Sequence, residues 1–337
     1  MGSHKIPAEA DRARRRHWQP WGTVSERSKQ LITLIAPAFN EAANASELAE
    51  FFRQVRTSRP DVDFELIVVD DGSTDDTARL ARAALADQDR VTVLSLSRRF
   101  GSHAALSAGL AHSAGDCAIT VSTDIQEPVE VIGRFLDSWH AGHDLVWGVR
   151  ATRADRRMVR NLVSRRFSPL FRKASGLDGY PAEGPSQALL SRAVIDVLNR
   201  LPERNRNLWA LCAWLGFSQD TISFHQRPRQ AGESKWTTAD RLKLMTDSVV
   251  GFSAKPFNYA LAFGALLGTG GLIAVALLLF LAPAGWALVL GAVIALAGIQ
   301  LVVLGGLGLY VWRIAEDARA RPLYVLREHG PPTQEVP

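Results

Sequence analysis

Polar residues able to bind a charged substrate follow short apolar runs at four places in the first half of the chain. These clusters are Asn40-Glu41, Asp70-Asp71, Arg98-Arg99 and Asp124. Their carboxylates suit ribose hydroxyls, base N–H groups or a divalent metal ion. Cations able to neutralise phosphate come later in the chain, at Arg150, Arg160, Arg229 and Lys235. Carboxylates, a metal ion and separate Arg or Lys side chains are together the groups that hold a diphosphate.

The apolar runs before these clusters have the composition of β-strands. They cover Leu31–Pro37, Phe64–Val69, Val91–Leu96 and Asp116–Val121. Helical patterns lie between them, up to about Val55 and over Thr77–Leu85 and Ala104–Ser113. Strands that alternate with helices predict an α/β fold with a mostly parallel sheet. Ligands of such sheets bind outside the carboxyl ends of the strands, where all four clusters are expected, and this convergence indicates an enzyme.

Several other classes of protein are excluded. Neither G-x-G-x-x-G nor G-x-x-x-x-G-K-S/T follows the first apolar run, so the phosphate loop of dinucleotide-binding and P-loop proteins is absent. Cys117 and Cys212 are isolated, which argues against a zinc site and a disulfide framework. The chain has 39 Lys+Arg against 34 Asp+Glu, a formal net charge of +5, and we expect no nucleic-acid partner.

The second feature of the chain is an uncharged tail. From Pro256 to Trp312, 57 consecutive residues contain no Asp, Glu, Lys, Arg or His. A turn at Pro283-Ala284-Gly285 separates segments of about Tyr259–Ala282 and Trp286–Trp312, each long enough to cross a hydrocarbon core of ~30 Å. We expect a two-helix transmembrane hairpin rather than a buried pair of a soluble protein, because a soluble core needs far fewer uncharged residues. Cations flank both ends of this tail, so the positive-inside rule places the catalytic domain and both termini in the cytoplasm, at the inner membrane.

These features divide the chain into five parts. They are a basic N-terminal arm (1–30), a catalytic domain (31–237), a juxtamembrane interfacial helix (238–255), the transmembrane hairpin (256–312) and a cytoplasmic tail (313–337). Inside the catalytic domain, apolar residues at helical spacing predict a further helix at about 206–217. Such a stripe is typical of a buried core helix or, beside a membrane anchor, of a helix on the membrane surface.

Taken in order, the motifs of the chain resemble those of family 2 glycosyltransferases with the GT-A fold, in which the sheet is Rossmann-like. The similarity is strongest to the branch that loads a sugar onto polyprenyl phosphate, with dolichyl-phosphate mannose synthase-like and bactoprenol glucosyltransferase-like proteins. It extends from about Leu31 to Glu328. The matching segments are Ala36–Glu41, Val69–Asp75, Leu96–Gly101, Asp124–Pro128, Gly148–Arg150, Arg229–Trp236 and Arg321–Val325.

The resemblance implies a role for each matching residue. The pocket for the nucleotide sugar would comprise Pro37, Phe39, Glu41, Asp70, Asp71, Ser73, Ser122, Arg229, Ser234 and Lys235. Mg²⁺ or Mn²⁺ would bind to Asp124 and Gln126. The acceptor phosphate would bind to Arg99, Arg150, Arg160 and Ser164. The groups expected to act in the reaction are Asp124, Glu127, Arg229 and Lys235. For Asp70 and Asp71, capping of the next helix is the alternative.

The chain departs from the family pattern at two positions. The metal motif of the family usually contains Asp-x-Asp, whereas Ser122 stands at the first position here. Ser186 stands where relatives carry an acidic residue near the acceptor, with Glu183 and Asp178 nearby. A phosphate monoester acceptor is already anionic, so geometry and stabilisation of the leaving group can carry the reaction without a strong base.

The expected activity is therefore an inverting, metal-dependent transfer of a hexose or pentose from a nucleotide diphosphate sugar to polyprenyl phosphate. By resemblance, the donor would be a UDP-sugar and the protein a homo-oligomer such as a tetramer. One alternative is a catalytically impaired scaffold of a lipid-linked sugar pathway, which the two serine departures would suit. The other is a transferase with a different lipid or polysaccharide acceptor. A processive synthase is disfavoured, because the Gln-x-x-Arg-Trp motif is absent and one hairpin cannot form a polymer channel.

Overall fold

The computed structural model describes residues 29–151, 172, 175–201, 203, 206–225 and 285–327, together with individual positions between 262 and 277. The predicted juxtamembrane helix (238–255) and nearly all of the N-terminal arm lie outside the described residues.

Seven strands form one sheet in the order β3-β2-β1-β4-β6-β5-β7. The strands are β1 (Leu31–Ala38), β2 (Asp63–Asp70), β3 (Val91–Ser95), β4 (Cys117–Thr120), β5 (Leu145–Arg150), β6 (Gln187–Ser191) and β7 (Gln219–Phe224). Strand β6 is antiparallel to both β4 and β5, and the four other pairings are parallel. The predicted α/β fold with a mostly parallel sheet is confirmed, whereas the sequence pattern did not predict that β6 separates β4 from β5.

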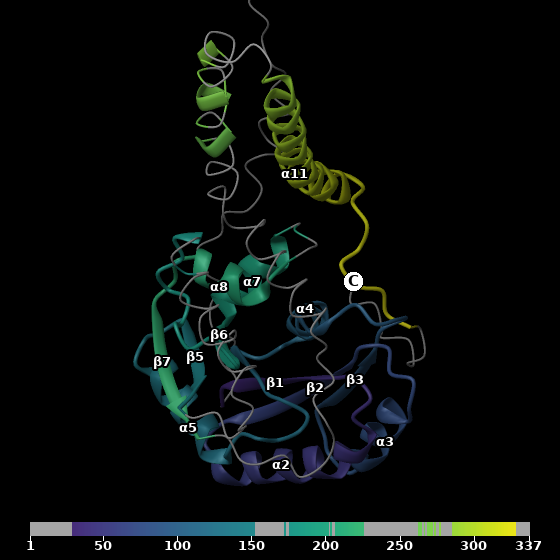
Figure 1. Cartoon of the computed structure of the whole chain (residues 1–337). Coiled ribbons are helices and arrows are strands. Elements are labelled where there is room, and N and C mark those ends of the chain that lie inside the picture. The colour runs from purple at the N-terminus through teal and green to yellow at the C-terminus, as the bar shows by residue number, and fades with distance from the viewer. Residues whose placement is uncertain are drawn as a thin grey trace, which may run out of the picture.

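Helices cover both faces of this sheet (Figure 1). They are η1 (Ala42–Asn44), α2 (Ala45–Ser58), α3 (Thr77–Ala84), α4 (Ser102–His112), α5 (Val129–His140), α7 (Arg192–Arg200) and α8 (Leu208–Trp214). One core cluster lies between the sheet and α2, α3 and α5, and a second lies between the sheet and α4, α7 and α8. Strand β1 is buried along almost its whole length, as expected of a central parallel strand covered on both faces.

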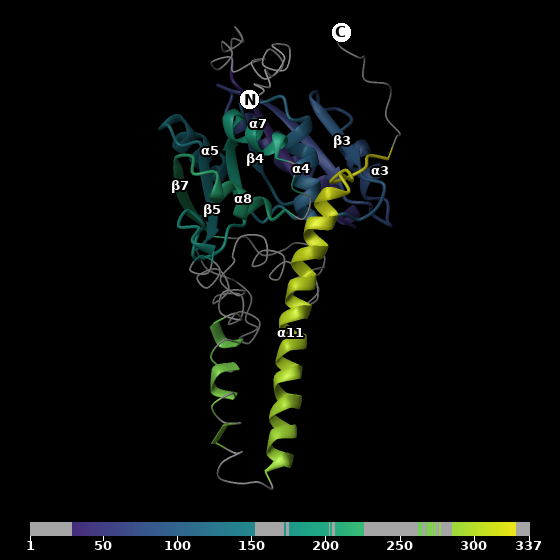
Figure 2. The same cartoon turned by 90° about the horizontal axis from the view of Figure 1, so that it is seen from above.

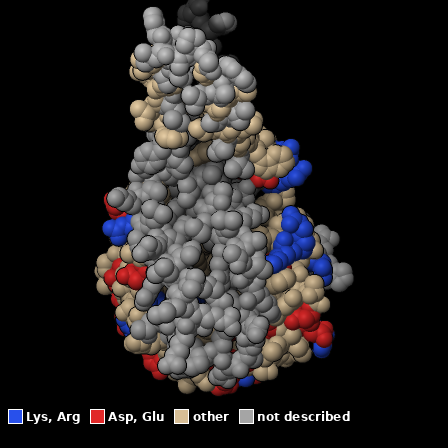
Figure 3. All heavy atoms as spheres, viewed as in Figure 1, with Lys and Arg blue, Asp and Glu red and all other residues tan. Residues whose placement is uncertain are grey.

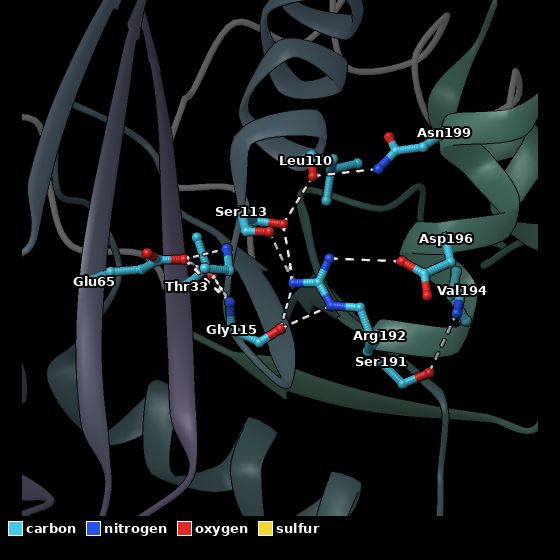
Figure 4. A network of polar contacts seen from close by, with 11 residues as sticks. Thr33, Glu65, Leu110, Ser113, Gly115, Ser191, Arg192, Val194, Asp196 and Asn199 are labelled. Carbon is cyan, nitrogen blue, oxygen red and sulfur yellow. Dashed lines mark hydrogen bonds and ion pairs between the residues drawn. The ribbon is translucent and has the colours of Figure 1, made fainter. Parts of the chain in front are cut away.

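The amino edge of the sheet is closed by a polar network (Figure 4). Glu65 accepts hydrogen bonds from Thr33 Oγ1 and from the N–H groups of Ala114 (2.7 Å) and Gly115 (3.1 Å). Arg192 donates to the carbonyl of Gly115 (2.9 Å from Nε) and to that of Ser113 (3.1 Å). These bonds tie the end of α4 to β1, β2 and the start of α7.

The predicted helix at 206–217 corresponds to α8, and most of its apolar residues face the protein core. Leu208 and Leu211 are fully buried, whereas Trp214 is 58% exposed. Trp214 is therefore the large apolar side chain with which α8 could contact a membrane surface. The location of α8 on a membrane surface stays a prediction.

The C-terminal apolar segment forms α11 (Trp286–Ala318), which continues beyond the predicted end at Trp312. Among the described residues, the part Val289–Ala318 is the one helix long and apolar enough to cross a membrane. The described positions between 262 and 277 are helical and lie beside α11 (Figures 1 and 2). A Cβ atom at Gly271 would lie 3.7 Å from Leu296 of α11. The complete hairpin stays a prediction.

Candidate active site

The loops that follow β1 and β2 are bonded to each other at the carboxyl edge of the sheet. The Asn40 N–H donates to Ser73 Oγ (2.8 Å), and Asn40 Oδ1 accepts from the Thr74 N–H (2.8 Å). The Glu41 N–H donates to Thr77 Oγ1 (2.8 Å). Asn40 has a φ of 53°, a left-handed conformation that asparagine adopts more readily than most residues. Ser73 and Glu41, both predicted pocket residues, thus lie in two loops that are hydrogen-bonded to each other, and the side chain of Asn40, from the first predicted polar cluster, helps to join them.

The two aspartates at the end of β2 are buried and bind backbone N–H groups. Asp70 Oδ1 accepts from the Ser73 N–H (3.0 Å). Asp71 is 4% exposed, and its two oxygens accept from the N–H groups of Phe100 (2.6 Å) and Gly101 (2.8 Å). Burial raises the pKa of Asp71, while these two donors lower it in part. Each carboxylate offers about four acceptor positions, so both retain capacity for a ligand.

Neither aspartate caps the next helix, α3, and no side-chain capping bond is made by the residue at its N-cap position. Helix α3 has Asp76 at its N-cap position, and the Thr77 N–H donates to Asp75 Oδ1 (3.1 Å). Asp70 and Asp71 therefore hold the loops of the carboxyl edge, and the capping alternative is wrong for both.

The loop from Ser97 to Gly101 packs directly against the end of β2. Gly72 has a φ of 68°, and a Cβ atom there would lie 2.3 Å from the carbonyl carbon of Arg98. Only glycine fits this close backbone approach. The Arg99 guanidinium lies 4.4 Å from the centre of the Phe39 ring, in cation–π contact. Arg99 is thus grouped with the predicted nucleotide residues Phe39 and Asp71, and its assignment to the acceptor phosphate stays a prediction.

The loop after β4 carries the predicted metal ligands. Gln126 Nε2 donates to Asp124 Oδ2 (2.8 Å), so the two predicted ligands are adjacent. Ser122 Oγ donates to Glu127 Oε2 (2.6 Å), which explains how a serine occupies the first position of the motif. Ile125 between them has a φ of 40°, an outlier for a β-branched residue. Backbone strain of this kind concentrates at functional sites.

Glu127 is 1% exposed, and burial raises its pKa. The Ser122 hydrogen bond lowers that pKa, the negative charge of Asp124 raises it further, and Arg150 lowers it. Ser122, Asp124, Glu127 and Arg150 therefore form one electrostatic group at the ends of β4 and β5.

The predicted metal ligands fit a site shared with the substrate rather than a site built by the protein alone. No group of three or more His, Cys, Asp or Glu side chains in the described part of the chain is arranged to hold a metal ion. Asp124 and Gln126 offer one carboxylate and one amide oxygen. Mg²⁺ is commonly held by one or two carboxylates together with substrate phosphates and water, and these two residues suit that arrangement.

The second departure from the family pattern lies between β5 and β6. Both the N–H (3.0 Å) and the hydroxyl (3.2 Å) of Ser186 donate to the carbonyl of Gly148. The next residue, Gln187, is 2% exposed, and within the described part of the chain neither polar atom of its side chain has a hydrogen-bond partner. Gln187 was not among the predicted site residues, because a buried amide has no signature in a strand pattern.

The remaining predicted residues are only partly placed. The carbonyl of Pro37 accepts from Thr123 Oγ1 (3.4 Å), which joins the end of β1 to the loop after β4. The structure thus brings the predicted residues of 37–127 and Arg150 to one edge of the sheet. The other predicted residues lie outside the described part of the chain: Arg160, Ser164, Arg229, Ser234 and Lys235.

Known proteins resemble the chain over most of its length. Residues 33–198 match the domain described as Glycosyl transferase family 2. The bactoprenol glucosyl transferase of Shigella phage SfX is 30% identical over 302 residues, which are 88% of this chain and 98% of that protein. The uncharacterized glycosyltransferase sll0501 of Synechocystis sp. is 29% identical over 303 residues, 88% of this chain and 95% of that protein.

A solved structure is also similar. The crystal structure of glucosyl-3-phosphoglycerate synthase from Mycobacterium tuberculosis, in complex with Mn²⁺, UDP and phosphoglyceric acid, is 23% identical to the chain. The match covers 66% of this chain and 76% of that one, with a TM-score of 0.47. The motifs, the matched domain and the full-length relatives agree, and the chain belongs to glycosyl transferase family 2 and is a glycosyltransferase.

Proposed function

We propose that this protein transfers a sugar from a nucleotide diphosphate sugar to polyprenyl phosphate at the inner face of the cytoplasmic membrane. The observation that carries the proposal is the gathering of Asp70, Asp71 and Asp124 with Arg99 and Arg150 at one edge of the sheet. The name of the Shigella phage relative, a bactoprenol glucosyl transferase, supports a polyprenyl phosphate acceptor.

In this proposal the nucleotide lies against the loops after β1, β2 and β3. Asp71 and Asp70 would accept from the base or the ribose, and Phe39 with Arg99 would border the pocket. Asp124 and Gln126 would hold Mg²⁺ or Mn²⁺, which neutralises the diphosphate when bound. The resemblance implies a catalytic role for Glu127. Because Glu127 is buried and hydrogen-bonded to Ser122, we propose instead that it positions the loop after β4.

The reaction needs no covalent intermediate. An oxygen of the acceptor phosphate attacks the anomeric carbon, and the bond between that carbon and the β-phosphate oxygen breaks. The electron pair leaves with the nucleoside diphosphate, and the configuration is inverted. An ionised phosphate has no proton to lose, which agrees with a serine at position 186 instead of an acid.

The proposed membrane position relies on α11 and its surroundings. Lys and Arg gather on the flank where α11 meets the tail (Figure 3), and Arg319, Arg321 and Arg327 of that segment are exposed. Cations beside a span favour the cytoplasmic side. With both native cysteines buried, Gly285→Cys should react with an impermeant reagent from outside and Arg321→Cys should not. The reverse pattern would refute the proposed topology.

A panel of nucleotide sugars tests the proposed activity. The purified full chain is incubated with each donor, polyprenyl phosphate and Mg²⁺ or Mn²⁺, and the lipid product is identified by mass spectrometry. We expect one donor, with UDP as its nucleotide, to give a polyprenyl phosphate sugar. No product with any donor would favour the scaffold alternative.

Separate variants test the two phosphate sites. Arg160→Ala should raise the KM for the lipid about tenfold and leave the KM for the nucleotide sugar nearly unchanged, because charge-assisted contacts to phosphate are strong. Arg229→Ala and Lys235→Ala should instead lower kcat or raise the KM for the nucleotide sugar. If Arg160→Ala affects only the nucleotide sugar, the two sites are assigned the wrong way round.

A further inference from the structure

The segment after α11 returns to the catalytic domain and binds the edge of the sheet. Strand β3 is the outermost strand on its side, so its backbone groups would otherwise lack partners there. The Ser97 N–H donates to the carbonyl of Val325 (2.8 Å), and the Arg327 N–H donates to the carbonyl of Ser95 (2.7 Å). Leu96 and Leu326 face each other in this short antiparallel pairing.

Side chains of the same segment are anchored in the core. Tyr324 and Leu326 pack against the cluster between the sheet and α4, α7 and α8. Tyr324 is half-buried, and burial raises its pKa. Arg206, which precedes α8, interacts electrostatically with Tyr324 and donates to the carbonyls of Leu201 (2.8 Å) and Glu203 (2.9 Å). The segment after α11 is therefore held to the catalytic domain by packed side chains as well as by the backbone hydrogen bonds. We call this contact the junction.

This junction lies at the start of the loop Ser97–Gly101, which borders the proposed nucleotide site. The Leu96 N–H donates to the carbonyl of Asp70 (2.8 Å), so the residue opposite Leu326 is bonded to the first buried aspartate. The following residues supply the N–H groups of Phe100 and Gly101 that Asp71 accepts. A displacement of Ser95–Ser97 would therefore move the loop that borders Asp71 and Phe39.

We propose that Tyr324–Arg327 is a positioning strand for the nucleotide site, which links the affinity for the nucleotide to the anchored C-terminal helix. Its backbone fixes Ser95–Ser97, and this fixes the loop that carries Arg99 and the donors to Asp71. The link to the nucleotide rests on the proposed function, whereas the holding of the loop does not.

One pair of variants isolates the backbone bond. Arg327→Pro removes the N–H that donates to Ser95, and Arg327→Ala removes the same side chain but keeps that N–H. In the full chain without substrate, hydrogen exchange of the Ser97, Phe100 and Gly101 amides should be about tenfold faster in Arg327→Pro than in Arg327→Ala. Unchanged exchange of these amides would overturn the proposal.

The kinetic prediction is a split between the two substrates. Relative to Arg327→Ala, Arg327→Pro should raise the KM for the nucleotide sugar about fivefold, as expected for one lost hydrogen bond. The KM for the lipid and kcat should stay within about twofold. Faster exchange with an unchanged nucleotide KM, or an equal loss in all three constants, would also overturn the proposal.

Two further measurements keep the test decisive. If Arg327→Pro does not fold, Tyr324→Ala is compared with Tyr324→Phe, which keeps the buried ring, and the same results are expected. If the wild-type protein transfers no sugar, the KM is replaced by the dissociation constant of UDP with Mg²⁺. The exchange difference would then support the strand while the proposed function fails.

Discussion

At each edge of the sheet one carboxylate accepts hydrogen bonds from two consecutive backbone N–H groups, but the surroundings differ: Glu65 is partly buried and Asp71 is buried. At the amino edge, Glu65 accepts from two consecutive N–H groups, those of Ala114 and Gly115 (Figure 4). At the carboxyl edge, Asp71 accepts from the consecutive N–H groups of Phe100 and Gly101. Each carboxylate joins a strand to a neighbouring loop, so both help to hold the fold.

The surroundings distinguish the two. Glu65 also accepts a hydrogen bond from the Thr33 hydroxyl, and Arg192 donates to the nearby carbonyls of Ser113 and Gly115. Asp71 instead lies beside Asp70, and Glu127 lies beside Asp124; burial and these like charges raise the pKa values of Asp71 and Glu127. Concentrated negative charge destabilises a folded protein and is typical of a site that binds a metal ion or substrate. The comparison favours a stabilising role for the amino edge and supports the proposed binding site at the carboxyl edge.

Strand β4 allows the sharpest test, because an aspartate flanks each of its ends. Asp124→Ala should lower kcat/KM by at least about 100-fold, a loss on the order of 3 kcal/mol, because the proposed metal ligand is removed. Asp116→Ala removes an acceptor for the Leu31 N–H (2.8 Å) and should lower the free energy of unfolding by about 1 kcal/mol with kcat/KM nearly unchanged. Steady-state kinetics and urea unfolding measure both variants. Full activity in excess EDTA, or similar activity losses in both, would contradict the assignment.

Arg192 tests the amino edge from the side of stability. Arg192→Met should lower the free energy of unfolding by about 2 kcal/mol, because the carbonyls of Ser113 and Gly115 lose their donor. The KM for the nucleotide sugar should not change. The control Arg79→Met breaks an exposed pair with Asp76 (2.9 Å) and should leave the free energy of unfolding nearly unchanged, because solvent screens such a pair. A raised KM for the nucleotide sugar with an unchanged free energy of unfolding would contradict a purely stabilising role for the amino edge.

Glu127 should show the smallest effect, and one that depends on pH. Because its folded pKa is raised from 4.5, the folded state binds its proton more tightly than the unfolded state. The resulting stability is present below pH 4.5 and is lost as the pH rises through the folded pKa. Glu127→Gln cannot ionise, so its Tm relative to wild type should rise with pH, by about 2 °C. Thermal unfolding at pH 4 and pH 8 measures this, with Glu130→Gln as the control. A Tm difference that is equal at both pH values would contradict a raised pKa of Glu127 in the folded state.

Much of the fold follows from local patterns. The strands predicted before each polar cluster appear as β1 to β4, because short β-branched runs between polar loops favour strands whatever surrounds them. The convergence of Glu41, Asp71 and Asp124 at one edge follows in turn from the parallel arrangement of these strands. The uncharged tail also predicts α11 from composition alone.

The partners of the site residues do not follow from such patterns. In the sequence, Ser122 is only a departure from the Asp-x-Asp motif of the family. Its hydrogen bond to Glu127 depends on the turn at Ile125. In the sequence, Asp71 is a residue type typical of turns and helix caps. Only the packing of Gly72 against Arg98 brings the N–H groups of the loop after β3 to its carboxylate. Hydrogen bonds between distant segments depend on backbone geometry that carries no periodic signal.

The sequence by itself thus determined the alternation of strands and helices, the edge at which the polar clusters gather, and the apolar helix at the C-terminus. Each of these depends on the spacing of apolar and polar residues within one segment. Only the tertiary structure decided that β6 enters the sheet antiparallel between β4 and β5, and that Val325–Arg327 pairs with the end of β3. These pairings join segments far apart in the chain, and they are selected by the burial of side chains such as Leu96 and Leu326 against a core that exists only after folding.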